Sequence, residues 1–296
     1  MAVTIPEIIE KKKREEKISM LTAYEAPIGR LLDEAGVDII LVGGSLGMVA
    51  LGYPTTVPVT MDEMIHHSKA VRRVVGRALV VGDMPFMAFN ISREETIRNA
   101  GRFLKEAGCS AVKVEGGQGS VDSIEAVRAI IDAGSPVLGH LGLTPQTAGR
   151  VGGFKVQGKT ADAASAILQA AIELQEAGCF GVVLECVPSQ VAALITKKLS
   201  IPTIGIGAGA ECDGQVLVTH DLLGLTAGFY PKFARRFAQL DQSVVKAVKE
   251  FTAAISNGTF PSDQESYTMS PQELQRLRQV SGRKRKSKLI KIPKAS

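Results

Sequence analysis

One pattern recurs along the 296-residue chain: an amphipathic helix ends at a glycine, and a short apolar strand follows at once. The clearest copies are LLDEAGVDIILVGG from Leu31, FLKEAGCSAVKVEGG from Phe103, IIDAGSPVLGHLG from Ile130 and LQEAGCFGVVLECV from Leu174. Each glycine stands where a helix C-cap needs a left-handed residue, which glycine adopts without a Cβ clash. The strands that follow are short and rich in β-branched residues, as buried parallel strands are. The repeat therefore predicts an α/β fold with a parallel sheet.

Further strands and helices fit between these copies. Strands are expected at 18–24, 78–85, 202–208 and 215–220, and helices at 6–15, 26–36, 60–75, 92–108, 121–134, 160–178 and 189–199. Eight strands alternating with helices over about 240 residues predict a (β/α)₈ TIM barrel, with a doubly wound sheet as the alternative. We expect residues 1–265 to form a single barrel domain that includes a late helix at 241–256. Residues 266–296 are expected to form a basic, disordered C-terminal tail.

The charge of the chain is concentrated in that tail. The net charge is +5, and residues 282–296 contain seven Lys and Arg with no acid, which leaves a nearly neutral body. A nucleic-acid-binding face on the fold is therefore not expected. The sequence contains no apolar run of about 18 residues, so no membrane span is expected. The charged N-terminus does not resemble a signal peptide. The four cysteines lack C-x-x-C spacing, which favours reduced thiols in a cytoplasmic protein.

Several predicted strands end in a charged or polar residue within apolar sequence. These residues are Asp83, Lys113, Glu115, His140 and Glu185. In (β/α)₈ barrels the carboxyl ends of the strands carry the chemistry, and buried charges must meet each other, a metal or a substrate. Two carboxylates from adjacent strands suit Mg²⁺, and a neighbouring lysine suits a substrate carboxylate. A separate carboxylate such as Glu185 is free to move a proton.

The same residues also have structural interpretations. Each charge alone could form a structural salt bridge, and His140 alone is best interpreted as a hydrogen-bonded histidine, but five such residues at one rim favour a site. The G-I-G-A-G segment at 205–209 lacks G-x-G-x-x-G spacing, so close backbone approach is favoured over nucleotide binding. His66 and His67 have no partner at metal-ligand spacing and are expected on the surface or in packing.

The chain resembles the 3-methyl-2-oxobutanoate (ketopantoate) hydroxymethyltransferase family from about residue 4 to residue 262. The resemblance is carried by LVGGSLGMVALGYPTTVPVT from Leu41, GDMPFMAF from Gly82, AVKVEGG from Ala111, GHLGLTPQ from Gly139, GGFKVQGK from Gly152, LECVP from Leu184 and IPTIGIGAGAECDGQVLV from Ile201.

The resemblance implies transfer of a one-carbon unit from 5,10-methylenetetrahydrofolate to 3-methyl-2-oxobutanoate. The product is 2-dehydropantoate, on the route to pantothenate and coenzyme A. It further implies Mg²⁺, which stabilises the enolate of the 2-oxo acid as a Lewis acid, and a homo-oligomer, often a decamer. Glu185 matches the family's proton acceptor, Asp83 and Glu115 match metal ligands, and Gly44, Ser45, Asp83 and Lys113 match substrate-binding positions.

One departure from the family pattern concerns the metal. The family has Leu-Val-Gly-Asp-Ser-Leu-Gly-Met, whereas this chain has LVGGSLGM, with Gly44 in place of the usual aspartate ligand. Mg²⁺ commonly binds through one or two carboxylates together with water and substrate oxygens. The alternatives are therefore an active hydroxymethyltransferase, a paralogue with an impaired metal site, and a Mg²⁺-dependent lyase or mutase of the phosphoenolpyruvate mutase/isocitrate lyase superfamily.

Overall fold

The structure, a computed structural model, describes residues 2–116, 121–226, 228 and 230–282. The contacts divide the chain into two compact units, the first ending at Leu240 and the second starting at Asp241. All the named strands belong to the first unit. Within the described ranges, no helix is both long and apolar enough to cross a bilayer.

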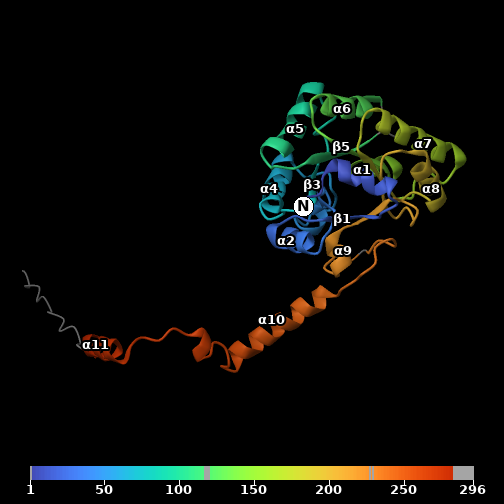
Figure 1. Cartoon of the computed structure of the whole chain (residues 1–296). Coiled ribbons are helices and arrows are strands. Elements are labelled where there is room, and N and C mark those ends of the chain that lie inside the picture. Colours follow the sequence, from blue (N-terminus) through green and yellow to red (C-terminus); the bar gives the residue numbers. More distant parts are fainter. Residues whose placement is uncertain (1, 117–120, 227, 229, 283–296) are drawn as a thin grey trace, which may run out of the picture. The chain divides into compact units, whose positions relative to one another are not determined.

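Eight parallel strands close into a barrel in sequence order (Figure 1). They are β1 (Ile18–Thr22), β2 (Ile39–Val42), β3 (Leu79–Asp83), β4 (Ala111–Glu115), β5 (Val137–Gly142), β6 (Gly181–Glu185), β7 (Thr203–Ile206) and β8 (Gly214–Leu217). The predicted (β/α)₈ barrel is confirmed, and the doubly wound alternative is wrong because β8 pairs with β1.

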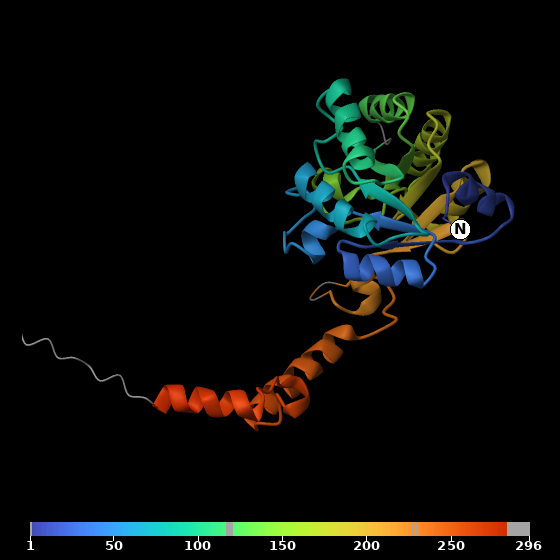
Figure 2. The ribbon, with the colours of Figure 1, turned by 60° about the vertical axis from the view of Figure 1, so that its left-hand side comes forward.

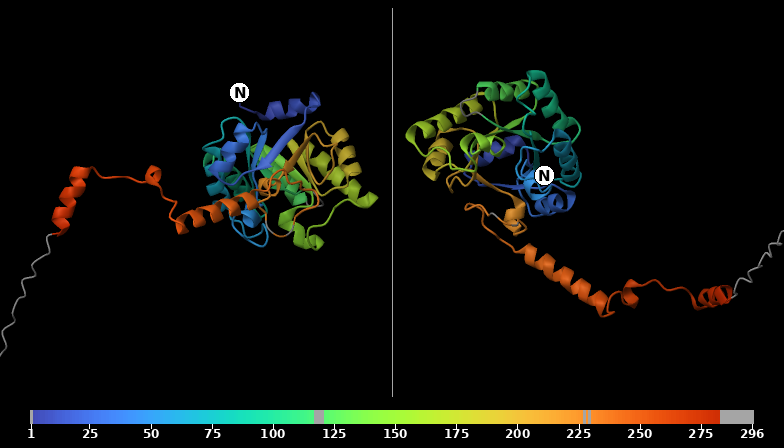
Figure 3. Two further views of the ribbon diagram at one scale, coloured as in Figure 1. Left: turned by 90° about the horizontal axis from the view of Figure 1, so that it is seen from below. Right: turned by 180° about the vertical axis from the view of Figure 1, so that it is seen from behind.

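Helices alternate with the strands and form a ring outside the barrel, as the views from other directions also show (Figures 2 and 3). The main helices of the barrel unit are α1 (Ile5–Lys13), α2 (Ala26–Glu34), α4 (Met61–Arg72), α5 (Arg93–Lys105), α6 (Val121–Asp132), α7 (Ala161–Glu176) and α8 (Ser189–Lys198). Short helices α3 (Leu46–Val49), η1 (Pro145–Val151) and α9 (Thr219–Leu223) lie in the loops after β2, β5 and β8.

The strand expected at 215–220 is wrong beyond Leu217. There β8 ends, and α9 begins at Thr219. The backbone N–H of Thr219 donates to Thr22 Oγ1 at 3.1 Å, and the hydroxyl of Thr219 donates to the Thr22 carbonyl. These two bonds fix the chain to the end of β1 and turn it into the helix.

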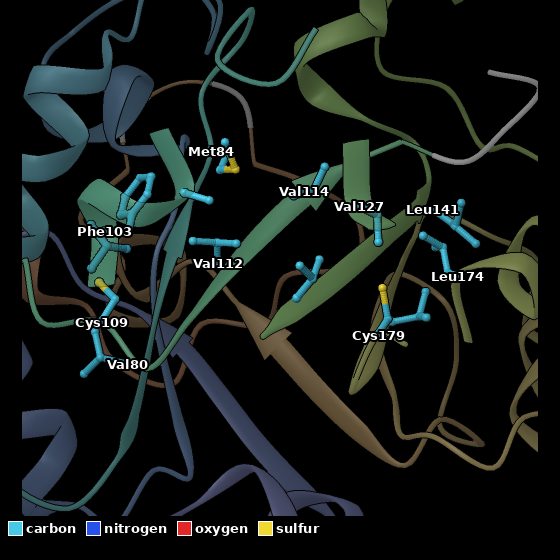
Figure 4. Packing of buried hydrophobic residues seen from close by; sticks show 14 of the residues in the cluster. Val80, Met84, Phe103, Cys109, Val112, Val114, Val127, Leu141, Leu174 and Cys179 are labelled. Atoms are coloured by element: carbon cyan, nitrogen blue, oxygen red, sulfur yellow. The ribbon is translucent and has the colours of Figure 1, made fainter. Parts of the chain in front are cut away.

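The core has two layers, because side chains alternate between the two faces of each strand. Leu79 and Val81 of β3 belong to a cluster inside the barrel, whereas Val80 belongs to the cluster between sheet and helices. Figure 4 shows the outer layer, in which Val80 and Val112 of the strands and Phe103 of α5 belong to one cluster, with Cys109 between Val80 and Phe103 in this view. Ile8 of α1 joins the inner cluster, so this helix closes one end of the barrel.

The strand register brings the polar strand ends together. Asp83 pairs with Lys113 across β3 and β4, and Glu115 pairs with His140 across β4 and β5. Glu185 pairs with Gly142 across β5 and β6. Asp83 and Glu115 stand two and four positions after the inward-facing Val81 and Ala111. The alternation therefore turns these acids into the barrel at its carboxyl end.

The second unit contains α10 (Leu240–Ser256), the short η2 (Asp263–Glu265) and α11 (Pro271–Gly282). The helix expected at 241–256 is thus present. Helix α11 lies inside the segment expected to be a disordered tail, and the basic residues at 283–296 lie outside the described residues. A single domain over residues 1–265 stays a prediction.

Candidate active site

A cavity of about 390 Å³ opens at the carboxyl ends of the strands. The structure brings every site residue expected from the sequence to its lining, which includes Gly44, Ser45, Asp83, Lys113, Glu115, His140 and Glu185. The floor is polar and buried, because Asp83, Lys113 and His140 are each at most 3 % exposed. Barrel enzymes carry their chemistry at this end of the fold.

Lys113 lies between two carboxylates on the cavity floor. Its Nζ is 2.7 Å from Asp83 Oδ1 and 3.7 Å from Glu115 Oε1. Burial lowers the pKa of a lysine, but the charges of Asp83 and Glu115 outweigh it and raise the pKa of Lys113 above its ordinary value. Lys113 therefore carries a positive charge inside the cavity.

The two carboxylates are also fixed by backbone groups. Asp83 Oδ2 accepts a hydrogen bond of 2.8 Å from the N–H of Gly44. Glu115 Oε2 accepts one of 3.0 Å from the N–H of Gln146. Burial raises the pKa of Glu115, although the charge of Lys113 opposes it. Both acids thus have a set orientation before any ligand enters.

Ser45 reaches the cavity from the turn after β2. Its Oγ lies 2.7 Å from the hydroxyl of Tyr24, which is fully buried behind it. Burial raises the pKa of Tyr24 well above its ordinary value, so the phenol stays neutral, and either hydroxyl can donate. Tyr24 therefore fixes the position of the serine hydroxyl at the cavity wall.

His140 links the lysine to the sixth strand. Its Nδ1 lies 3.2 Å from Lys113 Nζ, and its Nε2 lies 3.2 Å from Glu185 Oε2. An ammonium can only donate, so Nδ1 accepts and the ring proton is assigned to Nε2, facing Glu185. Burial, together with the charge of Lys113, lowers the pKa of His140 to about 4, so the ring is neutral. The expectation of a hydrogen-bonded histidine agrees with this geometry.

Asp83, Lys113, His140 and Glu185 follow one another in a row of polar side chains, and Glu185 lies at the end away from Asp83. Burial raises its pKa to about 8, and the charge of Lys113 offsets only part of that effect. Its backbone is fixed by the bond from Leu143 N to Glu185 O, 2.8 Å long. A carboxylate with a pKa near neutrality can accept a proton from carbon and return it, which is the requirement for a general base.

Asp83 and Glu115 are the two carboxylates of the cavity floor that a divalent cation would meet, and they lie on adjacent strands. In this structure both face the ammonium of Lys113. Hard carboxylate oxygens suit Mg²⁺, which completes its coordination with water and substrate. Among the described residues no cluster of three or more His, Cys, Asp or Glu has metal-site geometry. The chain itself thus offers two carboxylate ligands.

The structure adds lining residues that the sequence reasoning missed. They are Thr22, Thr56, Asp221 and Lys232 around the cavity, and Gln146 behind Glu115. Gln146 lies in the GHLGLTPQ segment, so a signal for it existed. Thr56 likewise lies in a quoted segment, LVGGSLGMVALGYPTTVPVT, but in the loop before α4, which no strand pattern marks. His67 Nδ1 lies 2.6 Å from the Tyr24 carbonyl oxygen, in agreement with a packing role.

Comparison with known proteins identifies relatives over most of the chain. The model of the family described as ketopantoate hydroxymethyltransferase matches residues 2–263. The 3-methyl-2-oxobutanoate hydroxymethyltransferase of Syntrophomonas wolfei is 54 % identical over 275 residues, which is 93 % of this chain and 99 % of that protein. The protein of the same name from Acetivibrio thermocellus is 54 % identical over 89 % of this chain and 92 % of its own length.

Solved structures show the same fold at low sequence identity. Phosphonopyruvate hydrolase, in a complex with oxalate and Mg²⁺, has a TM-score of 0.58 at 12 % identity, covering 96 % of this chain and 99 % of that one. The 2,3-dimethylmalate lyase, a member of the PEP mutase/isocitrate lyase superfamily, has a TM-score of 0.56 at 14 % identity, covering 95 % and 96 %. At this identity the likeness concerns the fold alone.

Proposed function

The chain belongs to the ketopantoate hydroxymethyltransferase family, and we propose that it transfers a one-carbon unit from 5,10-methylenetetrahydrofolate to 3-methyl-2-oxobutanoate. The product is 2-dehydropantoate. The observation that carries the proposal is the partly buried Glu185, with its pKa raised to about 8, in one cavity with the charged Lys113. A base and a carboxylate-binding cation in one cavity are what a 2-oxo acid needs for reaction at C3.

The proposed reaction starts with binding of the 2-oxo acid at the floor. The ammonium of Lys113 attracts the substrate carboxylate, and the hydroxyl of Ser45 donates to it. Ionised Glu185 then takes the proton from C3, and the electron pair of that C–H bond forms the C2–C3 double bond of the enolate. Nε2 of His140 faces Glu185 Oε2 at 3.2 Å and so limits where the carboxylate can lie. Because this ring is neutral, it does not compete for the proton at neutral pH.

The enolate carbon then forms the new C–C bond. C3 forms the new bond to the one-carbon unit, and both bonds of that carbon to folate nitrogens break. The bond to C3 replaces one of them and the hydroxyl of one water replaces the other. The C3 proton taken by Glu185 and the remaining proton of the water end on the two nitrogens, which gives tetrahydrofolate. Asp83 and Glu115 would hold Mg²⁺ at the floor. The ion supplies Lewis-acid stabilisation of the developing negative charge on the keto oxygen.

The test is product formation by the full chain. Protein incubated with 3-methyl-2-oxobutanoate, 5,10-methylenetetrahydrofolate and Mg²⁺ is expected to give 2-dehydropantoate by mass spectrometry. Loss of the C3–H signal in D₂O, followed by ¹H NMR without folate, checks the proton step separately. Absence of both product and exchange at every metal concentration would overturn the proposal.

Two alternatives lead to different results in the same assays. A paralogue with an impaired metal site, suggested by Gly44, would gain activity by orders of magnitude in a Gly44→Asp variant, whereas a working site would gain little. A lyase or mutase of the phosphoenolpyruvate mutase/isocitrate lyase type would turn over its substrate without folate. The shared fold is the support for the second alternative, and the family match favours the transferase.

We further propose a homo-oligomer, such as the decamer implied by the family resemblance, in the cytoplasm. The support for assembly is α10, which has no buried residue although Val244, Val248, Phe251 and Ile255 are apolar and about half exposed. A second copy of the chain would cover such a face. The four cysteines form no disulfide, which suits a reducing compartment. Sedimentation velocity should show a species larger than 31.4 kDa, and a monomer at micromolar concentration would contradict assembly.

A further inference from the structure

The segment that follows β8 supplies a part of the cavity lining that the proposed proton transfer does not use. Asp221, Thr226 and Phe233 of this segment line the same cavity as Lys113 and Glu185. The cavity, about 390 Å³, lies within the usual size range of pockets that hold drug-sized ligands. A small 2-oxo acid fills only part of such a space, so a second substrate has room beside it.

Asp221 is a buried carboxylate with an unused oxygen. The residue is 6 % exposed, and it lines the cavity. Its Oδ1 accepts a hydrogen bond from the hydroxyl of Thr226. Among the described residues nothing donates to Oδ2, and Oδ2 is not one of the unpaired side-chain atoms that are closed to solvent. Because a buried carboxylate with so few donors is costly, a ligand in the cavity is expected to supply the missing donors.

The position of Asp221 is set by the chain on both sides of it. Before it, α9 begins with the two hydrogen bonds from Thr219 to Thr22 at the end of β1. After it, the phenol of Tyr230 donates to the Asp221 carbonyl oxygen at 3.3 Å. The bond from Thr226 then fixes one oxygen of the side chain. The carboxylate therefore has a set orientation before a ligand binds, as a binding group should have.

Phe233 adds an aromatic ring to the same lining. A Cβ built on Gly207, just after β7, would come within 2.9 Å of Phe233 Cδ1 and 3.2 Å of Phe233 Cβ. The ring thus lies against the backbone of Gly207, where any larger residue would displace it. Phe233 also packs against the cluster inside the barrel and is partly exposed. The cavity therefore offers an apolar ring as well as an unused acceptor.

The two substrates of the proposed reaction differ in what they offer a carboxylate. A 2-oxo acid has a carboxylate, a keto oxygen and alkyl groups, so it brings no hydrogen-bond donor and carries a like charge. The pterin of a folate is a planar ring with two neighbouring donors, the N3–H and the 2-amino group. Such a pair can form two parallel hydrogen bonds with a carboxylate. Each carboxylate oxygen has two lone pairs, so the bond from Thr226 leaves both oxygens of Asp221 able to accept.

We propose that Asp221 binds the pterin of the folate through its N3–H and 2-amino groups, and that the ring of Phe233 packs against the pterin. The inference rests on the folate donor of the proposed function and gives that donor a place in the cavity. The one-carbon unit is carried at the other end of the pterin from the 2-amino group. Asp221 and Phe233 hold the folate, while Lys113 and Glu185 bind and deprotonate the 2-oxo acid.

Calorimetric titration of the full chain with tetrahydrofolate tests the assignment without turnover. Asp221→Asn keeps the shape of the side chain but loses one acceptor and the charge. The dissociation constant should therefore rise at least about tenfold, the usual cost of losing hydrogen bonds to a charged group. Phe233→Leu should raise it severalfold, whereas Phe233→Tyr keeps the ring and should bind as the unaltered chain does. Glu211→Gln, which removes an exposed acid outside the cavity lining, is the matched control.

The sharpest result comes from changing the ligand and the protein together. A tetrahydrofolate analogue without the 2-amino group should bind the unaltered chain more weakly than tetrahydrofolate does. Asp221→Asn should weaken binding of this analogue by a smaller factor than binding of tetrahydrofolate, because one of the two hydrogen bonds is already absent. An equal loss for both ligands would mean that Asp221 only supports the fold of its segment. No loss for either ligand would place the pterin elsewhere, and each of these two results would overturn the proposal.

Exchange of the C3–H of 3-methyl-2-oxobutanoate separates failure of the pterin site from failure of the proposed function. Without folate, Asp221→Asn should retain this exchange, and its loss would place Asp221 in the 2-oxo acid site and overturn the proposal. If the unaltered chain exchanges C3–H but does not bind tetrahydrofolate, the folate donor and the pterin site are both wrong. If Asp221→Asn binds tetrahydrofolate as well as the unaltered chain does, the pterin site alone is wrong. Thermal unfolding of each variant checks that it is folded.

Discussion

At the amino ends of the strands, Asp38 accepts hydrogen bonds from Lys11 Nζ, the Ser19 N–H and the Ser19 hydroxyl, each at 2.8–2.9 Å. At the carboxyl ends, Glu185 is partly buried in the cavity wall, and the nearest ring nitrogen, Nε2 of His140, lies 3.2 Å from it. Burial alone would raise the pKa of both. At Asp38 the bonds from Lys11 and Ser19 outweigh burial and lower the pKa, whereas at Glu185 burial prevails and raises it to about 8.

The difference shows what each end of the barrel contributes. A carboxylate surrounded by donors keeps its charge and stabilises the fold, and Lys12 with Asp213, 2.7 Å apart, repeats this arrangement beside α1. A carboxylate with few donors has a raised pKa, so it binds a proton readily and can exchange it near neutral pH. In this fold, residues at the amino ends of the strands usually stabilise the barrel, and residues at the carboxyl ends usually carry the chemistry.

The largest expected effect is loss of the base at the carboxyl end. Glu185→Gln keeps the shape of the side chain but cannot accept the C3 proton, so kcat should fall about 10³-fold. Because the neutral side chain suits the buried position, unfolding by urea should show no loss of stability. The measurement is C3–H exchange by NMR together with product formation. Activity within a factor of ten of the unaltered chain would remove Glu185 from the chemistry.

The second prediction concerns the amino end. Asp38→Ala leaves Lys11 without its partner and removes the acceptor for Ser19, so the free energy of unfolding should fall by about 3 kcal/mol. The kcat of the folded protein should not change, because α1 lies at the other end of the barrel. Urea unfolding is the measurement. Glu10→Ala, which breaks only the exposed pair with Lys13, is the control and should have no measurable effect. A loss of activity without a loss of stability would contradict the comparison.

The sequence predicted the barrel and the carboxyl-end cluster for a local reason. Each helix, its C-cap glycine and the next strand are adjacent in the chain, and parallel strands must bring their carboxyl ends together. The alternation of side chains then places Lys113 and Glu115 on the same face. Neither the order of the elements nor the alternation of side chains depends on how the loops fold. Together they were enough to predict that Asp83, Lys113, Glu115 and Glu185 lie in one cavity.

Other features depended on contacts between distant residues. The tautomer of His140 follows from distances to Lys113 and Glu185, and the place of Thr56 follows from the fold of a loop. The end of β8 is set by bonds between Thr219 and Thr22. Helix α11 is a different case, because Pro271 at its start and the good helix formers after it were a local signal. The basic run that follows obscured that signal.

A smaller effect is expected when the partner of the base is changed. His140→Phe fills the space but donates nothing to Glu185 and accepts nothing from Lys113, so kcat should fall about tenfold while KM changes little. His140→Asn retains a donor and an acceptor and should recover part of the loss. Steady-state kinetics of both variants gives the kcat and KM values. If both variants changed KM alone, His140 would position the substrate and not the base.

The smallest effect is the pH dependence of stability in metal-free protein. The folded pKa of Glu185, about 8, lies above its unfolded value, so the folded state binds the extra proton and stability falls as pH rises toward and through 8. Between pH 7 and pH 9 the loss of unfolding free energy should be about 1 kcal/mol.

The contribution of Asp38 has the opposite sign. Its folded pKa is lowered, so it stabilises the fold at any pH above its unfolded pKa, and this stabilisation is lost only in acid, as pH falls through the folded pKa. Urea unfolding with EDTA at pH 7–9 should therefore show a slope that Glu185→Gln removes and Asp38→Asn does not. An unchanged slope in Glu185→Gln would place the proton on another group and end the contrast between the two carboxylates.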